Sequence, residues 1–299
     1  MKKNLLFTVV LFTLFISCSK DSVNEVPITP TLPSTEINKI PISISTQITR
    51  ATDTDFERDD KVGLYVVNYN GSTPVALVST GNHVDNMRFT YSGSWTPDQE
   101  VYWKDESTKA DFYIYYPYTP NITKVTAFPI AVKTDQSSEE NYKASDFLWG
   151  KSAGIAPTKN AVNMMVKHLT SNIIIKLVPG DGYKKEDLST AKVEICGLKT
   201  NATVNLTNGE VTATGVSADI KPINETTQYR ALVIPQSVTD KDLIRIKIGN
   251  DTYLLKQSIN LAPNKQYTST ITINRSSQGI NIGIGDWEED DADYGGTVG

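Results

Sequence analysis

The chain of 299 residues carries 29 Lys and Arg against 34 Asp and Glu, a net charge of −5, and 39% of it is hydrophobic. This length and apolar content suffice for one large domain or for two of ordinary size. The acidic balance argues against nucleic acid as a partner. The two histidines, His83 and His168, are too few for a His-rich metal site or for catalysis by a histidine pair, so no cofactor is expected.

The N-terminus has the pattern of a bacterial lipoprotein signal peptide over residues 1–17. Two lysines precede an apolar run at residues 5–16, which is too short for a bilayer, because spanning one takes about 20 residues. Ser17 and Cys18 follow this run directly, and the sequence at this point resembles a lipobox. We expect Cys18 to be the first mature residue and to carry a lipid that anchors the protein in the cell outer membrane. The alternative is an ordinary cleaved signal peptide with an incidental cysteine.

The rest of the chain reads as a tether, a β-rich body and a tail. Prolines among polar residues predict an extended tether at 18–39. About 16 short strand patterns in roughly 260 residues then predict an all-β fold with two β-sandwich domains in tandem. The turn-rich stretch near residue 160 divides the body into 40–160 and 161–285. Residues 286–299 hold six acidic residues and no basic one, and predict a mobile tail.

The predicted strands follow from alternating or β-branched runs between clusters of Gly, Pro, Asn and Asp. One or two helical turns are expected at 183–188. The predicted strands cover residues 40–48, 62–68, 75–79, 87–91, 111–118, 125–132, 147–150, 162–168, 171–179, 191–198, 203–206, 210–213, 229–235, 243–249, 252–259, 266–274 and 280–284.

Aromatic residues and single polar residues add local expectations. Both faces of the 111–118 strand are aromatic, which predicts a central strand covered on both sides. We expect three tryptophans to anchor the core of the first sandwich, with a sugar-stacking stripe as the alternative. His168 is interpreted as structural, and Cys196 as a buried free thiol. The tryptophans concerned are Trp95, Trp103 and Trp149.

A series of short motifs then points to a family. The motifs are ITRA at 48–51, FERDDKVGLYV at 56–66, WTP at 95–97, VYWK at 101–104, ADFYIYYPY at 110–118, DFLWG at 146–150, VKHLTSNI at 166–173, LAPNKQY at 261–267 and DWE at 286–288. Their order resembles that of Bacteroidales fimbrillins, the minor-fimbrillin-like group of type V pilus subunits. The resemblance implies two transthyretin-like β-sandwiches and a pilus subunit exported as a lipoprotein.

The resemblance also implies a maturation site. In the family, a trypsin-like protease removes the N-terminal segment after a basic residue, and Arg50–Ala51 fits that position. The alternative is an ordinary surface arginine. Cleavage there would remove the first strand, whose Ile40, Ile42 and Ile44 share one face. The loss would leave an apolar groove beside unpaired backbone groups.

The C-terminal part offers a matching strand. Ile280, Ile282 and Ile284 repeat the spacing of the three isoleucines in the first strand. We therefore expect the tail of one subunit to fill the groove of the next by donor-strand addition, which builds a filament. The alternative makes residues 280–284 the last strand of their own C-terminal sandwich.

The sequence is compatible with three functions to different degrees. The leading prediction is a surface-exposed lipoprotein that acts as a fimbrial subunit or fimbria-associated adhesin, with other fimbrial subunits as partners and an unknown receptor. The alternative is a surface glycan-binding lipoprotein of a nutrient-uptake system, which exposed tryptophans would favour. The third, a secreted hydrolase, is disfavoured because nucleophile-elbow, P-loop, Cys-x-x-Cys and His-Glu-x-x-His motifs are absent. The chain is therefore not expected to be an enzyme, although paired carboxylates leave a glycosidase open.

Overall fold

The computed structural model describes residues 39–49, 55–226, 228–275, 282–284 and 288–289. Within them the chain forms 18 strands in three sheets, with two short α-helices and one 3₁₀ turn. The predicted all-β class is thus confirmed as a mainly β fold, while the tandem transthyretin-like sandwiches stay a prediction. None of the helices in this part of the chain is long and apolar enough to cross a membrane.

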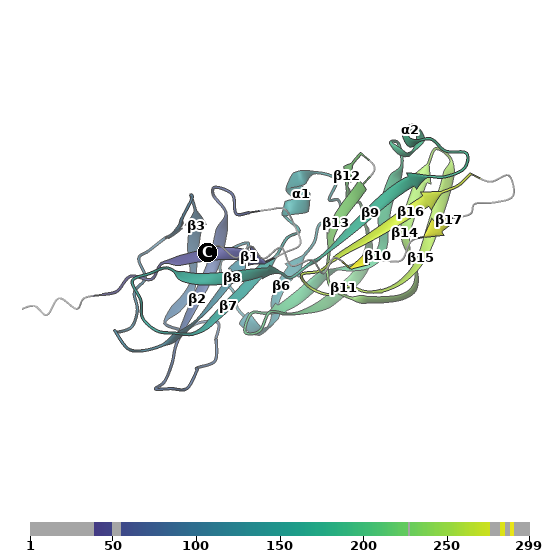
Figure 1. Ribbon diagram of the computed structural model, residues 1–299. Helices are drawn as coiled ribbons and strands as arrows, with labels where there is room; N and C mark the ends of the chain where they lie inside the picture. Colours follow the sequence, from purple (N-terminus) through teal and green to yellow (C-terminus); the bar gives the residue numbers. More distant parts are fainter. Residues whose placement is uncertain (1–38, 50–54, 227, 276–281, 285–287, 290–299) are drawn as a thin grey trace, which may run out of the picture. The chain divides into compact units, whose positions relative to one another are not determined.

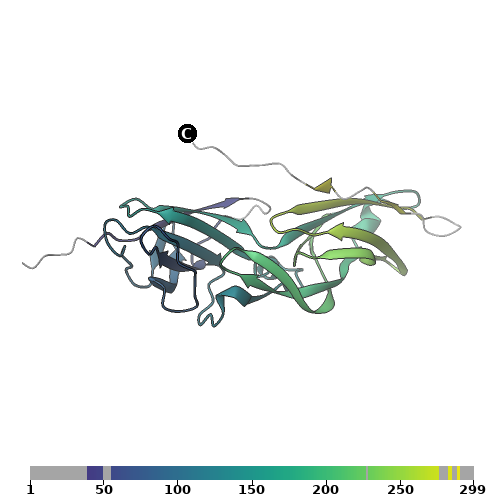
Figure 2. The ribbon, with the colours of Figure 1, turned by 90° about the horizontal axis from the view of Figure 1, so that it is seen from below.

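The first sheet has seven strands and contains the N-terminal strand. Its order is β1-β8-β7-β5-β2-β3-β4, and every neighbouring pair is antiparallel except β1 and β8. Figures 1 and 2 show β1, in purple, beside the teal β8. The strands are β1 (Ile44–Thr49), β2 (Lys61–Asn68), β3 (Val84–Tyr91), β4 (Trp95–Pro97), β5 (Ala110–Tyr116), β7 (Leu148–Ile155) and β8 (Val162–His168).

The second sheet has the order β11-β10-β14-β15, and β6 also pairs with β10. The predicted strands at 191–198 and 203–206 form one continuous strand, β10. The strands are β6 (Phe128–Ala131), β10 (Lys192–Asn205), β11 (Glu210–Ile220), β14 (Ser237–Ile248) and β15 (Asp251–Asn260).

The third sheet has the order β12-β13-β9-β16-β17, with β18 also paired to β16. The β9 and β16 strands run parallel. The strands are β9 (Ser171–Pro179), β12 (Ile223–Glu225), β13 (Gln228–Val233), β16 (Gln266–Ile273), β17 (Ile282–Ile284) and β18 (Glu288–Glu289).

Two hydrophobic cores lie on opposite faces of the first sheet. On the central strand β5, Phe112 and Ile114 belong to one core, whereas Tyr113 and Tyr115 belong to the other. The prediction of a central strand covered on both sides is therefore confirmed. We call the core that contains Phe112 the N-terminal core. The core that contains Tyr113 extends through the second and third sheets.

The buried tryptophans divide between these cores. Trp95 and Trp103 lie in the N-terminal core, as predicted. The prediction for Trp149 is wrong, because it packs in the other core and its indole nitrogen donates to the carbonyl oxygen of Leu206 at 2.9 Å. Successive residues of β7 face opposite sides of the sheet, so Trp149 cannot share a core with its neighbour Leu148.

Local structure differs from the predictions in several places, among them residues 125–127, which form a 3₁₀ turn before β6 and not part of a strand. The strand expected at 75–79 does not form, and the apolar run reflects one buried side chain, Leu77. The helix α1 (Glu139–Lys143) was not predicted, whereas α2 (Lys185–Leu188) lies within the predicted helical turns. Ser138 caps α1, because its hydroxyl accepts a hydrogen bond from the backbone N–H of Asn141 at 3.2 Å.

Sheet membership crosses the division expected between residues 160 and 161. β6 precedes that division but pairs in the second sheet, and β8 follows it but pairs in the first. The two 40–160 and 161–285 domains therefore stay a prediction as folding units. The last strand of the first sheet ends at His168, eight residues beyond the expected division.

Candidate functional site

The predicted removable strand fills the N-terminal core. Ile42 and Ile44 are only 4% and 5% exposed, and Ile40 and Ile48 pack against the same core while half-buried. The alternation predicted for Ile40, Ile42 and Ile44 thus puts all three in contact with one core. The side chain of Ser45, next to Ile44 on the strand, is less buried than its isoleucine neighbours.

This part of the chain pairs with backbone on both sides. Before β1, the Ile42 N–H donates to the Val101 carbonyl at 2.8 Å, and Trp103 N–H donates to the Ile40 carbonyl at 2.9 Å. Within β1, six residues pair in parallel with β8, from Ile44 opposite Val162 onward. Residues 40–49 therefore connect β8 with the chain that follows β4, and their loss would leave backbone groups unpaired along both neighbours.

A polar contact interrupts the apolar face of β1. The indole nitrogen of Trp95 donates a hydrogen bond to the Thr46 hydroxyl at 3.0 Å. Trp95 belongs to β4, at the other end of the strand order from β1. The hydroxyl thus satisfies a donor that is otherwise shielded from water, since Trp95 is 8% exposed.

The residues that follow the predicted cleavage site are held in place by aromatic and polar contacts. Phe56 packs edge-on against Trp95 and Tyr116, at ring-centroid distances of 4.9 and 5.7 Å. The Tyr116 hydroxyl donates to the Asp60 carboxylate at 3.1 Å. Burial and the negative charge of Asp60 raise the pKa of Tyr116, so its hydroxyl stays protonated and remains a donor.

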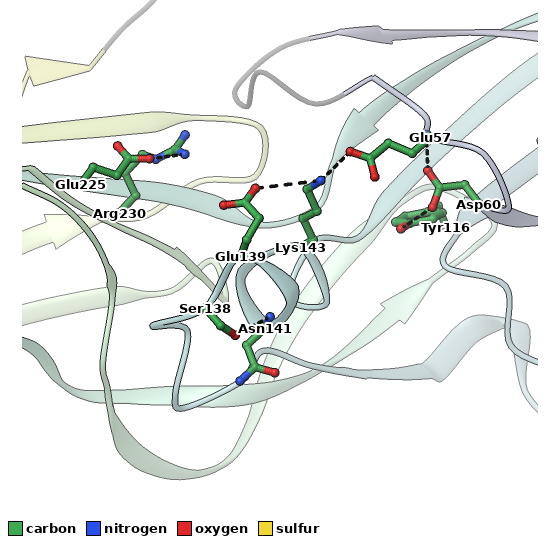
Figure 3. A network of polar contacts seen from close by, with 9 residues as sticks. All are labelled: Glu57, Asp60, Tyr116, Ser138, Glu139, Asn141, Lys143, Glu225 and Arg230. Carbon is green, nitrogen blue, oxygen red and sulfur yellow. Dashed lines mark hydrogen bonds and ion pairs between the residues drawn. The ribbon is translucent and has the colours of Figure 1, made fainter. Parts of the chain in front are cut away.

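Helix α1 adds a cationic contact to this segment, as Figure 3 shows. The Lys143 ammonium group lies 2.5 Å from a carboxylate oxygen of Glu57, and this hydrogen bond raises the pKa of Lys143. On the buried side of α1, the Tyr142 ring lies 5.1 Å from the Arg230 guanidinium, which forms an ion pair with Glu225 at 2.6 Å. The helix therefore connects residues 57–60 with β13.

A cavity of ≈ 50 Å³ lies where the end of β1 meets this segment and α1. Its lining residues are Ile48, Asp55, Phe56, Glu57, Asp60, Tyr116, Tyr142, Lys143, Asp146, Leu148 and Leu232.

The C-terminal strand pairs within its own chain. β17 runs antiparallel to β16, with Ile282 opposite Ile273 and Ile284 opposite Ile271. This arrangement agrees with the alternative in which 280–284 is the last strand of its own sheet. It leaves the donor role as a proposal.

Several predicted site residues lie outside the described residues: Cys18, Arg50, Ala51 and Ile280.

Two contacts of the site were not predicted from the sequence, that of helix α1 with Glu57 and that of Thr46 with Trp95. The Ser138-Glu139-Glu140 run is an N-terminal helix signal that could have revealed α1. No local signal could have paired Thr46 with Trp95, because 49 residues separate them.

The buried titratable residues His168 and Cys196 lie in the protein interior. His168 is buried, with Nδ1 2.7 Å from a carboxylate oxygen of Asp146, and the Thr170 hydroxyl donates to the same oxygen at 3.4 Å. Cys196 is a buried free thiol, as predicted. Within the part of the chain that the structure describes, no three His, Cys, Asp or Glu residues form a group that could hold a metal ion.

The chain belongs to the Fimbrillin-like family, whose pattern matches residues 49–287. The family resemblance of the sequence is thereby confirmed. Fimbrillins are structural proteins and not enzymes, in agreement with the prediction.

Individual relatives agree with this assignment. The chain is 24% identical to the "Putative fimbrium subunit Fim1C" of Bacteroides uniformis over 96% of each sequence. Its fold is similar to that of a "putative cell adhesion protein" from Bacteroides uniformis, with a TM-score of 0.65 and 21% identity over 84% of this chain and 97% of the other. A "putative cell adhesion protein" from Bacteroides ovatus gives a TM-score of 0.65 and 19% identity, over 84% and 98%.

Proposed function

We propose that this protein is a surface-exposed lipoprotein that acts as a fimbrial subunit or fimbria-associated adhesin and polymerises by proteolytic strand replacement. Cys18 carries the lipid, and cleavage after Arg50 releases β1. The C-terminal strand of a neighbouring subunit, centred on Ile282, then fills the vacated groove. The fimbrillin family and the relationship to a fimbrium subunit support a place at the cell surface among other fimbrial proteins.

The observation that carries this proposal is the burial of Ile42, just before β1, and of Ile44, the first residue of β1, in a segment that ends at Thr49. A cut after Arg50 would separate residues 40–49 from the rest of the chain and would remove no other strand of the first sheet. Burial of the Ile42 and Ile44 side chains contributes roughly 3–6 kcal/mol, at about 1.5–3 each. The cleaved subunit would therefore have an exposed apolar groove with a strong preference for a new strand.

The proposed donor is the C-terminal tail, which would have to leave β16 of its own chain. The tail has five residue pairs with β16, three through β17 and two through β18, whereas β1 has six with β8. In the groove of the next subunit the tail would take the place of β1 beside β8 and pair with its backbone by strand addition. The contact is head-to-tail and does not close on itself, so repetition builds a filament.

The first experiment tests cleavage. The full chain is treated with a trypsin-like protease, and the polymers are examined by electron microscopy and N-terminal sequencing. We expect polymers whose subunits begin at Ala51, and we expect Arg50→Gln to prevent them. Arg58→Gln is the matched control, since Arg58 is an exposed arginine in the segment held by Glu57 and Asp60. Polymers that begin at Cys18 would contradict the proposal.

A second experiment tests the donor strand. Ile282→Asp with Ile284→Asp is expected to abolish polymers of the cleaved protein without unfolding the monomer. A disulfide between Cys residues introduced by Thr272→Cys and Gly283→Cys, at paired positions of β16 and β17, would hold the tail on its own chain. Reduction should restore polymerisation of this variant. Normal polymers under oxidising conditions would rule out the tail as donor.

A third experiment tests the anchor. Cys18→Ala should move the protein from the membrane fraction to the soluble fraction and remove the mass of the lipid. A lipid chain contributes about 0.8 kcal/mol per buried methylene group, so its loss leaves no comparable attachment. The control is Cys196→Ala, which changes a cysteine in the folded body. An unchanged mass and fractionation of the Cys18→Ala variant would contradict lipidation.

The burial of the tryptophans does not favour the glycan-binding alternative. Trp95, Trp103 and Trp149 are 8%, 5% and 8% exposed. A sugar ring stacks on an accessible aromatic face, and these rings are covered by protein. Among the described residues, these three tryptophans therefore offer no stacking platform.

A further inference from the structure

The inward face of β1 is not uniformly apolar. Ile42 and Ile44 are followed, two residues on, by Thr46, whose hydroxyl accepts the hydrogen bond of the Trp95 indole at 3.0 Å. Successive side chains alternate along a strand, so Thr46 continues the row that begins with the isoleucines. The groove under β1 therefore presents two apolar positions and then one hydrogen-bond donor.

An indole N–H can only donate. A strand that replaces β1 with an apolar side chain at the Thr46 position would leave the Trp95 donor buried and unpaired, which is unfavourable. The described part of the N-terminal core already contains one such donor, because the indole nitrogen of Trp103 is buried without a hydrogen-bond partner. Trp95 differs from Trp103 in that its partner is supplied by the exchangeable strand.

We propose that Trp95 determines the specificity and register of strand replacement, by selecting strands with the pattern apolar-x-apolar-x-acceptor. This inference rests on the proposed function and names the chemistry of the accepted strand. The occupant is the tail of a second copy of this chain. When Ile282 and Ile284 take the places of Ile42 and Ile44, the residue that follows at the Thr46 position in the sequence is Asp286.

Aspartate has the chemistry that this position requires. Its carboxylate is an acceptor, and a hydrogen bond from a neutral donor to a charged acceptor is stronger than one between neutral groups. A shift of the tail by two residues would place Ile284 opposite Trp95 and leave the indole unpaired. The donor on Trp95 thus favours one register among those that the repeated isoleucines would otherwise permit.

The first test uses the intact full chain and the strand that it already contains. Urea unfolding is measured for Thr46→Val, Thr46→Asp and Trp95→Phe, and for each Thr46 change combined with Trp95→Phe. We expect Thr46→Val to lower the folding equilibrium constant about tenfold when Trp95 is present and much less when it is replaced. Thr46→Asp should be tolerated better than Thr46→Val only when Trp95 is present.

The control is Trp103→Phe, which removes an indole from the same core that has no hydrogen-bond partner. In that background Thr46→Val should retain its full effect. Equal effects of Thr46→Val in chains with and without the Trp95→Phe change would overturn the inference, because the indole would then not distinguish an acceptor from an apolar group.

The second test uses strand capture. The acceptor is the full chain cleaved after Arg50, with Ile282→Asp and Ile284→Asp so that its own tail does not compete. The probes are synthetic peptides of residues 278–289, with Asp286 or with Asp286→Val. We expect the valine peptide to bind at least about tenfold more weakly, and the difference to vanish in an acceptor with Trp95→Phe.

The outcomes distinguish the proposed role of Trp95 from strand replacement itself. Equal affinity of both peptides for the Trp95 acceptor would overturn the role of Trp95 while leaving strand replacement intact. Failure of both peptides to bind any cleaved acceptor would overturn strand replacement itself, and the role of Trp95 with it.

Discussion

The Trp149 indole nitrogen donates a hydrogen bond to the Leu206 carbonyl oxygen at 2.9 Å, and so joins the first sheet to the second. Trp149 belongs to β7, and Leu206 follows the end of β10. The turn closes against the ring at Gly209, which has a φ of 76°. A Cβ atom at that position would lie 2.5 Å from the Trp149 ring.

Gly209→Ala is therefore expected to destabilise the protein by about 2–4 kcal/mol, from the positive φ together with steric overlap. The matched control is Gly71→Ala, since Gly71 has a φ of 61° but nothing within 4 Å of its hypothetical Cβ. The control should lose only about 1–2 kcal/mol. Chemical denaturation of both variants measures the difference, and equal losses would show that the ring contact carries no cost.

Ile44→Ala should destabilise the uncleaved protein by about 2–5 kcal/mol, because it leaves a cavity in the N-terminal core. Ser45→Ala, at the next position of the same strand, should change the free energy of unfolding by less than about 0.5 kcal/mol, since its side chain lies off the core face. Urea denaturation checks both. A small effect of Ile44→Ala would mean that β1 does not contribute to the core as described.

Lys143→Gln tests the contact between α1 and the segment at Glu57. Both side chains are substantially exposed, so the ion pair should contribute less than about 1 kcal/mol despite its short distance. Lys104→Gln, at an exposed position elsewhere, serves as the control. Denaturation at low and high salt provides the measurement. A loss of several kcal/mol would show that the segment depends on this single charge pair.

The Cys196 thiol should be unreactive in the folded protein. Burial raises its pKa from 9.0 to about 11, so little thiolate exists at pH 8. The raised value means that this group favours folding below pH 9 and that the contribution is lost as the pH rises towards 11. In a Cys18→Ala chain, we expect thiol-specific reagents to label Cys196 rapidly only in denaturant. Rapid labelling of the native protein at pH 8 would contradict its burial.

Alternation along single strands was the part of the fold that the sequence could predict. Both faces of β5 and the positions of Ile42 and Ile44 follow from a period of two, which needs only neighbouring residues. The short α2 was visible for the same reason. These features depend on local patterns that any folded context would preserve.

Contacts between distant segments were not predictable in this way. The pairing of β6 with β10, the core to which Trp149 belongs and the Trp95–Thr46 hydrogen bond each depend on which strands become neighbours. A single sequence specifies the alternation of a strand but not its partner. The sequence therefore predicted the candidate site as a strand with three isoleucines. It did not predict the hydrogen bond that the Trp95 indole donates to this strand.

The buried Gln136 has a consequence for the growing chain. Its side chain bonds to both the backbone N–H and the carbonyl oxygen of Leu232, 96 residues later in the sequence. During synthesis the N-terminal part emerges first. The Gln136 amide and the nearby β6 are therefore made before their partners, Leu232 and β10. A ribosome that stops between them releases a polypeptide with an open β edge, which is prone to aggregation. The chain must therefore extend at least through Leu232 before Gln136 and β6 both have their partners.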